Sequence, residues 1–345
     1  MINKKKSIFY LTKLFQEPIL PIQKTPKRSS SGDGYKPPWK ILFFGADNFS
    51  LFSLSALLNE YRKGETINKL EVCTSVKKIK NDVYKFAEKE NLRIRQWPPD
   101  LSQNEFDTGL VVSFGHLIPR NVIERFPLGM INVHASLLPQ WRGAAPIIYC
   151  LANGENVTGI SVMKIEPLKF DVGKILSQNS FNIPDDMYMP ELSNALGALG
   201  AKELINCLKD LPNRLINAKP QSENGISYAP KVNPSFAQID WKNMTSIKIF
   251  NLERALRGFL PLTSTWKGEI VKFFNVHKCQ DGSVIQIKPG FIIYDDELRV
   301  LKVCCADNKY VTIEKVQIFQ KKVMSAKDFN NGYLKKTPLE KRYFL

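Results

Sequence analysis

The side chains best suited to chemistry lie in one stretch, residues 129–147, which reads GMINVHASLLPQWRGAAPI. If MINVHAS forms a β-strand, Asn132 and His134 are two residues apart and project from the same face. An imidazole with an ordinary pKa of about 6.5 exchanges a proton near neutral pH. An amide supplies neutral hydrogen-bond donors. Together the two side chains can hold a developing oxyanion in a cleft at the carboxyl end of the strand.

Two other interpretations of this stretch remain open. A buried Asn and a buried His often do no more than satisfy backbone groups of a loop. Ser136 is also close enough in the chain to His134 to be considered as a nucleophile. The G-x-S-x-G turn that exposes a nucleophilic serine is absent around Ser136, which makes this second interpretation the weaker one.

The elements that position this stretch alternate between strands and helices. WKILFFGADNFS predicts a buried strand that ends at Gly45 and leads into a helix. KLEVCTS and GLVVSFG are typical of strands, and VYKFAEKE between them is typical of a helix. This alternation predicts an α/β fold with a doubly wound parallel sheet, whose ligands bind beyond the carboxyl ends of the strands. G-x-G-x-x-G is absent, so a dinucleotide cofactor is not expected.

Composition changes near residue 213, where Pro and Gly become frequent and apolar periodicity is weak. We expect a catalytic domain over residues 37–212, a linker over 213–233 and a C-terminal domain over 234–345. A helix is predicted over residues 246–257. The short alternating runs that follow, such as GEIVKFFNV, GSVIQI and YVTIEKVQI, predict a small β-barrel.

The first 36 residues are expected to be a presequence or a disordered basic tail. Residues 1–32 contain seven basic side chains and one acid, Glu17, with apolar residues between the lysines. Lys13 interrupts the apolar stretch, so a secretory signal fits less well. No apolar run in the chain approaches the roughly 18 residues of a membrane span.

The remainder of the chain is also basic. The tail contributes +6 to the formal net charge of +16, which leaves +10 for residues 33–345. Such a charge favours a polyanionic partner such as nucleic acid, although it can also serve solubility alone. A group of basic residues near the C-terminus is a candidate phosphate-contacting surface: Lys321, Lys322, Lys327, Lys335, Lys336, Lys341 and Arg342.

Metal binding and disulfides are not expected. The six cysteines and three histidines are scattered without the spacing of a zinc site. We interpret the cysteines as reduced thiols in the core.

Several stretches of the chain resemble those of a known family. INVHASLLPQWRGAAPI closely resembles the signature of the folate-dependent formyltransferases, and its WRGAAPI part is most similar to members that act on methionyl-tRNA. FFGADNFSL, SFGHLIPRNVIERFPLG, ISYAPKVNPSFAQIDW and KKVMSAKDFNNGYL agree with it, so the resemblance covers residues 39–334. It implies a formyltransferase domain followed by a barrel of the oligonucleotide-binding type. The implied reaction moves a formyl group from 10-formyltetrahydrofolate to the α-amine of methionine on initiator tRNA.

The resemblance also implies the site. Asn132 and His134 are expected to act with Asp171, which lies in FDVGKIL. Arg142 is expected either to contact a tRNA phosphate or the 3′ end, or to form a structural salt bridge. His116 is expected either to contact folate or to be a solvent-exposed spectator. Main-chain groups of two loops are expected to bind the folate, namely those of Phe114, Gly115, His116, Leu117, Ile118, Ser136, Leu137, Leu138 and Pro139.

Two departures from the bacterial pattern point to a mitochondrial member of the family. In place of the long basic insertion after the second strand, CTSVKKIKNDVYKF leaves room only for Lys77, Lys78 and Lys80. MKIEPLKFDVG has an extra residue and is more similar to the animal mitochondrial form. We therefore expect a monomeric enzyme of the mitochondrial matrix whose reading of the acceptor stem is weaker or differently built.

Three other functions remain as alternatives. A formyltransferase for a small amine, such as a sugar nucleotide or glycinamide ribonucleotide, shares the Asn-His-Asp chemistry but has less use for a basic barrel. A formyl-folate hydrolase uses water as the acceptor and releases formate. An RNA-binding protein without activity explains the basic barrel and leaves the three residues as a remnant.

Overall fold

The computed structural model describes residues 35–75, 80–279 and 287–345. All the helices and strands described below belong to the unit Lys36–Leu345. Residues 1–34 of the expected presequence, Lys77, Lys78 and nearly all of the expected strand GSVIQI lie outside the described residues.

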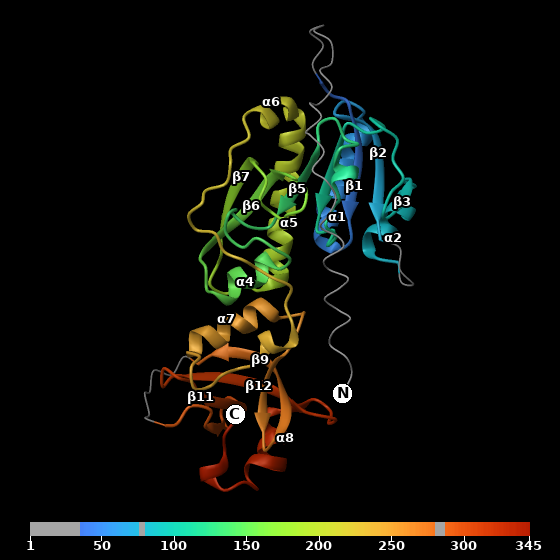
Figure 1. The fold of residues 1–345 in the computed structure, drawn as a ribbon. Coiled ribbons are helices and arrows are strands. Elements are labelled where there is room, and N and C mark those ends of the chain that lie inside the picture. Colours follow the sequence, from blue (N-terminus) through green and yellow to red (C-terminus); the bar gives the residue numbers. More distant parts are fainter. Residues whose placement is uncertain (1–34, 76–79, 280–286) are drawn as a thin grey trace, which may run out of the picture. The chain divides into compact units, whose positions relative to one another are not determined.

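A seven-stranded sheet forms the first part of this unit (Figure 1), in the order β3-β2-β1-β4-β5-β6-β7. The first five strands pair in parallel, which confirms the predicted α/β sheet, and the last two pair antiparallel. The strands are β1 (Trp39–Gly45), β2 (Ile67–Thr74), β3 (Ile94–Gln96), β4 (Thr108–Val112), β5 (Met130–His134), β6 (Val157–Lys164) and β7 (Ile175–Asn182).

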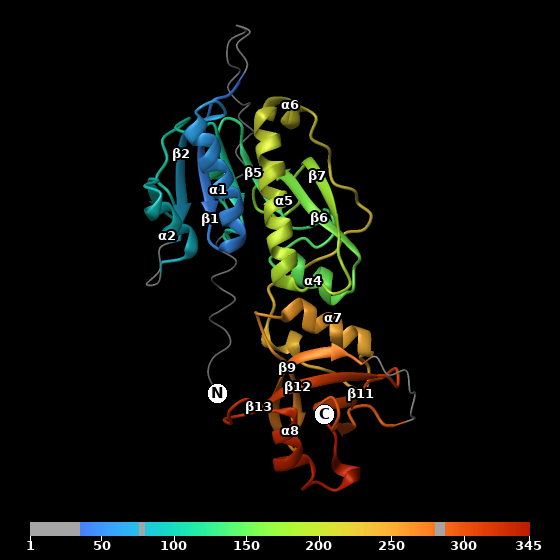
Figure 2. The ribbon, with the colours of Figure 1, turned by 180° about the vertical axis from the view of Figure 1, so that it is seen from behind.

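Helices cover one face of the sheet more fully than the other. α1, α2 and α5 share a core with the strands, and Figure 2 shows α1 and α5 on the same side of the sheet. On the opposite face, Phe44, Phe114 and Phe126 form a smaller aromatic cluster beneath loops and α3. The helices of this part are α1 (Asn48–Lys63), α2 (Asp82–Lys89), α3 (Arg120–Ile123), α4 (Pro146–Ala152), α5 (Met189–Lys209) and α6 (Leu211–Ile216).

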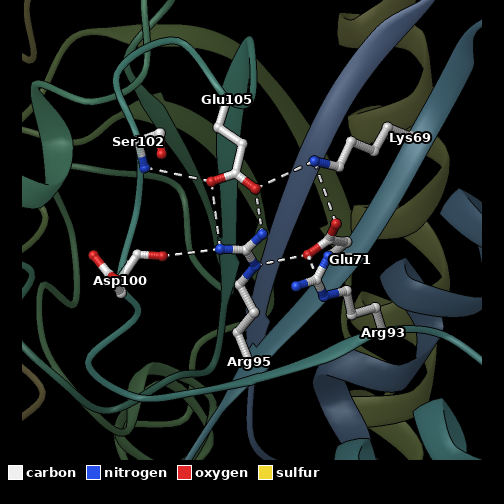
Figure 3. A network of polar contacts seen from close by, with 7 residues as sticks. All are labelled: Lys69, Glu71, Arg93, Arg95, Asp100, Ser102 and Glu105. Carbon is white, nitrogen blue, oxygen red and sulfur yellow. Dashed lines mark hydrogen bonds and ion pairs between the residues drawn. The ribbon is translucent and has the colours of Figure 1, made fainter.

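An ion-pair network fastens the short edge strand β3 to β2 and to the loop before β4 (Figure 3). Arg95 lies between two carboxylates: its Nε donates to Glu71 at 2.6 Å and its Nη2 donates to Glu105. Lys69 Nζ lies 3.3 Å from Glu71 and 3.4 Å from Glu105. Burial alone would raise the pKa of Glu105, but the hydrogen bonds and charge of Arg95 outweigh it and hold that pKa below its ordinary value.

An antiparallel sheet forms the C-terminal part, in the order β10-β11-β12-β9-β8, with β13 paired to β12. Its strands are β8 (Leu262–Trp266), β9 (Glu269–Lys278), β10 (Ile292–Asp295), β11 (Val300–Cys304), β12 (Tyr310–Ile318) and β13 (Met324–Ser325). The helix predicted over residues 246–257 is present as α7 (Ser246–Leu256), which begins where the Thr245 side chain accepts a hydrogen bond from Lys248 N. α8 (Ala326–Phe329) follows β13, and one-turn helices lie at Pro234–Ala237, Asn330–Leu334 and Leu339–Lys341.

The last residues of the chain lie between β8 and β10, the two ends of this sheet. Leu345 exchanges two backbone hydrogen bonds with Thr265 of β8. On the other side, Phe344 N donates to Gly290 O at 2.9 Å and Ile292 N donates to Arg342 O at 2.9 Å. The Phe344 ring is 1% exposed and packs against aromatic rings of the barrel core. The C-terminal segment thus completes the wall of the expected barrel, a role that strand patterning did not reveal.

The two parts of the unit meet at α4 and α7, where Lys248 Nζ donates to Ala152 O at 2.7 Å. The expected domain boundaries stay a prediction, and α6 overlaps the start of the expected linker. All six cysteines lie in the described residues as free thiols; five of them are buried, and Cys279 is only partly buried. Among the described helices, none has the length and apolar character needed to cross a membrane.

Candidate active site

Asn132 and His134 lie at the carboxyl end of β5, as the two-residue periodicity of a strand predicts. Both line a cavity of about 630 Å³ together with Asp171 and residues 114–118 and 143–148. This volume lies within the range of small-molecule sites, about 300–1,000 Å³. The structure thus brings together the three residues that the resemblance implied, and it does so in the crevice where a parallel sheet binds its ligands.

Asp171 is the centre of the three side chains. Its Oδ1 lies 3.6 Å from His134 Nδ1 and 3.5 Å from Asn132 Nδ2. Its Oδ2 accepts a hydrogen bond from Gly143 N at 2.8 Å. The His134 and Asp171 side chains are only 6% and 10% exposed, so the charge of the carboxylate acts on the imidazole with little screening by water.

The contact of His134 Nε2 determines which ring nitrogen carries the proton in the neutral imidazole. His134 Nε2 lies 2.9 Å from Trp141 O, and a carbonyl oxygen can only accept, so Nε2 is the donor. In the neutral ring Nδ1 is therefore unprotonated and faces Asp171. This nitrogen can take up a proton, and the imidazolium formed lies beside a carboxylate that stabilises it.

The backbone segments that contain Asp171 and Gly143 each pass very close to a neighbouring backbone carbonyl. Asp171 has a left-handed backbone with φ 54°, and two residues later a Cβ on Gly173 would lie 1.7 Å from Lys164 O. Gly143 has φ 126°, and a Cβ there would lie 2.6 Å from Ala229 O. Neither position has room for a side chain, so glycine is required at both.

The segment that connects the sheet to the barrel pairs with residues 141–145 beside the cavity. Trp141 N donates to Ser227 Oγ at 2.9 Å, and Arg142 N donates to Ser227 O at 2.9 Å. Ala229 N in turn donates to Arg142 O at 2.7 Å, and Ala145 N donates to Ala229 O at 3.0 Å. The Pro- and Gly-rich composition of this stretch predicts a linker and contains no signal for pairing with residues 141–145.

Arg142 reaches a neutral partner. Its Nε and Nη2 donate to Gln221 Oε1 at 3.1 and 2.6 Å. Gln221 Nε2 continues to the carbonyls of Asp171 at 2.8 Å and Gly173 at 3.0 Å. The expected contact of Arg142 with tRNA stays a prediction, and neither of the two described side-chain hydrogen bonds of Arg142 is an ion pair.

Residues 114–118 form the part of the cavity wall next to the aromatic cluster of the sheet. His116 is half-buried, with its ring 5.0 Å from that of Phe114 and 5.5 Å from that of Trp97. The ring therefore packs as part of the wall and is not a solvent-exposed spectator. Gly115 has φ 75°, which provides the turn that leaves main-chain groups at the cavity.

Residues 136–139 do not line this cavity. Ser136 is fully buried, and its Oγ donates to Gln140 O at 2.6 Å and is not directed at His134. Ser161 supports the same turn, since its Oγ donates to Ser136 O at 2.6 Å and accepts from Leu138 N at 3.0 Å. The geometry gives no support to Ser136 as a nucleophile, and a folate contact by these four residues stays a prediction. Within the described residues, no group of three or more His, Cys, Asp or Glu side chains is placed to hold a metal ion.

Comparison with known proteins identifies the family. The family model "Formyl transferase" matches residues 40–208, and "Formyl transferase, C-terminal domain" matches residues 231–334. The mitochondrial methionyl-tRNA formyltransferase of Bos taurus is 38% identical over 87% of this chain and 78% of its own length. The Homo sapiens protein of the same name is 38% identical over 87% of this chain and 79% of its own. The chain belongs to the methionyl-tRNA formyltransferase family.

Solved structures with the same fold lie further away in sequence. The N-formyltransferase of Helicobacter canadensis, solved with folinic acid and dTDP-3-aminofucose, has a TM-score of 0.59 at 18% identity, over 81% of this chain and 99% of that one. HypX of Aquifex aeolicus with tetrahydrofolic acid has a TM-score of 0.58 at 16% identity, over 87% of this chain but only 48% of that one. These likenesses concern the fold.

Proposed function

We propose that this protein transfers the formyl group of 10-formyltetrahydrofolate to the α-amino group of methionyl-tRNA and so produces the formylated initiator of translation. The observation that carries the proposal is the convergence of Asn132, His134 and Asp171 at one cavity of a chain that is 38% identical to mitochondrial methionyl-tRNA formyltransferases.

In this proposal His134 moves the proton. 10-Formyltetrahydrofolate supplies a formyl carbon that a neutral amine can attack. His134 Nδ1 accepts the proton that the attacking α-amine loses, while Nε2 stays bound to Trp141 O. Asp171 stabilises the imidazolium from 3.6 Å. The same proton then passes to the folate nitrogen as its bond to the formyl carbon breaks, so His134 ends the cycle neutral and no covalent enzyme intermediate forms.

Asn132 is assigned to the oxyanion. Its Nδ2 lies at 3.5 Å from Asp171, a long contact that leaves the amide able to donate into the cavity. A neutral donor placed where negative charge develops lowers the barrier because it needs no reorganisation during the reaction. His134 can add a second donor once Nδ1 is protonated.

The cavity suits a folate. Residues 114–118 line it with main-chain groups at a turn, beside the buried Phe114 ring and the half-buried His116 ring. A flat heterocycle packs on such apolar surfaces while backbone groups recognise its polar edge. We assign the donor to this side of the cavity and the aminoacyl acceptor to the side formed by residues 143–148, next to the basic side chain of Lys231.

The tRNA is assigned to the basic C-terminal surface. Its lysines Lys321, Lys322, Lys327, Lys335, Lys336 and Lys341 are exposed, whereas Arg342 Nε donates to Thr337 O at 2.9 Å. Exposed lysines attract phosphates without reading sequence. We further propose that the protein works as a monomer in the mitochondrial matrix, with weaker dependence on acceptor-stem bases than the bacterial enzymes. Strong dependence of formylation on those bases would count against the last point.

The deciding experiment measures transfer of labelled formyl from 10-formyltetrahydrofolate to methionyl-tRNA, with free methionine, uncharged tRNA and the His134→Ala protein as controls. We expect labelled product from charged tRNA only and a loss of about 100-fold or more with His134→Ala or Asn132→Ala, as for a removed oxyanion donor. Near-normal turnover of either variant contradicts the assignment of the site. Formate without labelled tRNA indicates a hydrolase, transfer to a sugar nucleotide indicates a small-amine enzyme, and tRNA binding without either product indicates an RNA-binding protein.

A further inference from the structure

We propose that Gln221 is a positioning residue whose side-chain amide, bound to Arg142, keeps the carboxylate of Asp171 beside His134. This inference rests on the proposed function, because it concerns the same site. We call the set formed by Gln221, the Arg142 guanidinium and the carbonyls of Asp171 and Gly173 the Gln221 clamp.

Both the oxygen and the nitrogen of the Gln221 side-chain amide form hydrogen bonds. Its Oε1 accepts from Arg142 Nε and Nη2 at 3.1 and 2.6 Å, in a two-pronged contact. Its Nε2 donates to Asp171 O and Gly173 O at 2.8 and 3.0 Å. One side chain from the connecting segment therefore ties the segment that contains Arg142 to the turn that contains Asp171.

Both joined segments contact the reacting side chains directly. Next to Arg142 in the chain, Trp141 O accepts from His134 Nε2 and Gly143 N donates to Asp171 Oδ2. On the other side of the clamp, Asp171 has a left-handed backbone with φ 54°, a conformation that is uncommon outside glycine and that Asp tolerates better than most residues. The two hydrogen bonds from Gln221 flank this residue, at its own carbonyl and at that of Gly173.

The donor ends of the clamp can be removed without shortening the side chain. Gln221→Glu keeps the acceptor for Arg142 and adds charge to that contact, but an ionised carboxylate cannot donate to the carbonyls of Asp171 and Gly173. Repulsion between these oxygens should displace the turn, and a displacement of about 1 Å at a reacting group costs about 100-fold in rate. We expect kcat to fall about 10- to 100-fold while KM for both substrates changes less than about threefold.

The matched control is Gln103→Glu. Gln103 Nε2 donates to the backbone carbonyl of Glu124 at 3.2 Å in an exposed loop, and Gln103 does not line the cavity. The same chemical change there should leave kcat and KM unaltered. The melting temperatures of both variants establish that the comparison is made on folded protein.

A double-mutant cycle tests whether Gln221 acts through Asp171. We expect Gln221→Glu to lower kcat by less than about threefold in a protein that already carries Asp171→Asn, because residues that act through one another are not additive. An equal loss in both backgrounds would overturn the proposal, as would a Gln221→Glu enzyme with more than half of the wild-type kcat. A raised KM with unchanged kcat would make Gln221 a substrate-binding residue instead, and that too would overturn it.

Hydrogen exchange at the Gly143 amide gives a readout that does not depend on the reaction. Gly143 N is bound to Asp171 Oδ2, so displacement of the turn exposes this amide to exchange. In protein labelled with ¹⁵N-glycine, we expect exchange at Gly143 to accelerate at least about tenfold in Gln221→Glu and to stay unchanged in Gln103→Glu. Unchanged exchange in Gln221→Glu refutes the clamp. If the wild-type protein transfers no formyl group while Gln221→Glu still shows the faster exchange, the proposed function is refuted and the clamp is left standing.

Discussion

Replacing Asp171 with Asn tests how much of the rate depends on the charge beside His134. The carboxylate lies 3.6 Å from Nδ1, and both side chains are at most 10% exposed. With an effective dielectric constant of about 20, the attraction between a carboxylate and an imidazolium at this separation is about 4.6 kcal/mol. Since about 1.36 kcal/mol corresponds to tenfold in rate, loss of the charge should lower kcat about 2,000-fold.

The substitution is conservative in the other contacts of this residue. An Asn side chain retains a carbonyl oxygen that can accept from Gly143 N, and Asn adopts a left-handed backbone about as readily as Asp. The loss is therefore expected in kcat, with KM for methionyl-tRNA and for the formyl donor within about threefold of wild type.

Single-turnover formyl transfer with both substrates saturating is the suitable assay, because it reports the chemical step. Asp82→Asn serves as the control, since Asp82 forms an exposed pair with Lys85 on α2, away from the cavity. An Asp171→Asn enzyme that retains more than a tenth of the wild-type rate would refute the electrostatic role. So would a loss confined to KM.

Three further predictions concern stability and thiol reactivity. Glu105→Gln should destabilise the protein by about 1–3 kcal/mol at pH 7 in urea unfolding. Because the pKa of Glu105 is lowered in the folded protein, the stabilising contribution of its carboxylate is complete above about pH 4.5 and is lost as the pH falls through the folded pKa. The difference in stability between the two proteins must therefore shrink in acid. Phe344→Ala removes a ring that is 1% exposed from the barrel core and should cost about 3–5 kcal/mol, and a cost below about 1 kcal/mol would show that the C-terminal segment does not support the barrel. Burial raises the pKa of Cys73 and of Cys150 to about 12, so the thiolate fraction at pH 8 is about 10⁻⁴ and mass spectrometry after iodoacetamide treatment should find both unlabelled until the protein unfolds.

The strands of the parallel sheet could be predicted because burial on both faces requires continuous apolar runs. WKILFFG and TGLVV contain such runs and form β1 and β4. β6 reads VTGISVMK, where Thr, Gly and Ser interrupt the pattern although six of its eight residues are buried. Tertiary packing, and not the local pattern, determines this strand, and the antiparallel end of the sheet was therefore not predicted.

In the candidate site, too, residues of one strand could be predicted together from the sequence, whereas residues far apart in the chain could not. Asn132 and His134 belong to one strand, so their common face follows from its periodicity. Asp171 lies 39 residues after Asn132, and only the family resemblance indicated it. Gln221 lies a further 50 residues along, in a segment without periodicity, and no pattern indicated it. Contacts between loops depend on the path of the folded backbone, which propensities do not encode.

Backbone atoms contact the side chains that we propose to react. His134 is oriented by the carbonyl of Trp141, and Asp171 by the amide of Gly143. A side-chain substitution cannot delete these groups, so the geometry is sensitive to changes that shift the segment itself. The connecting segment pairs with residues 139–145 along their length, and Gln221 holds the facing turn. The stretch between the two family-model matches, residues 209–230, therefore supports the candidate active site as well as connecting the domains.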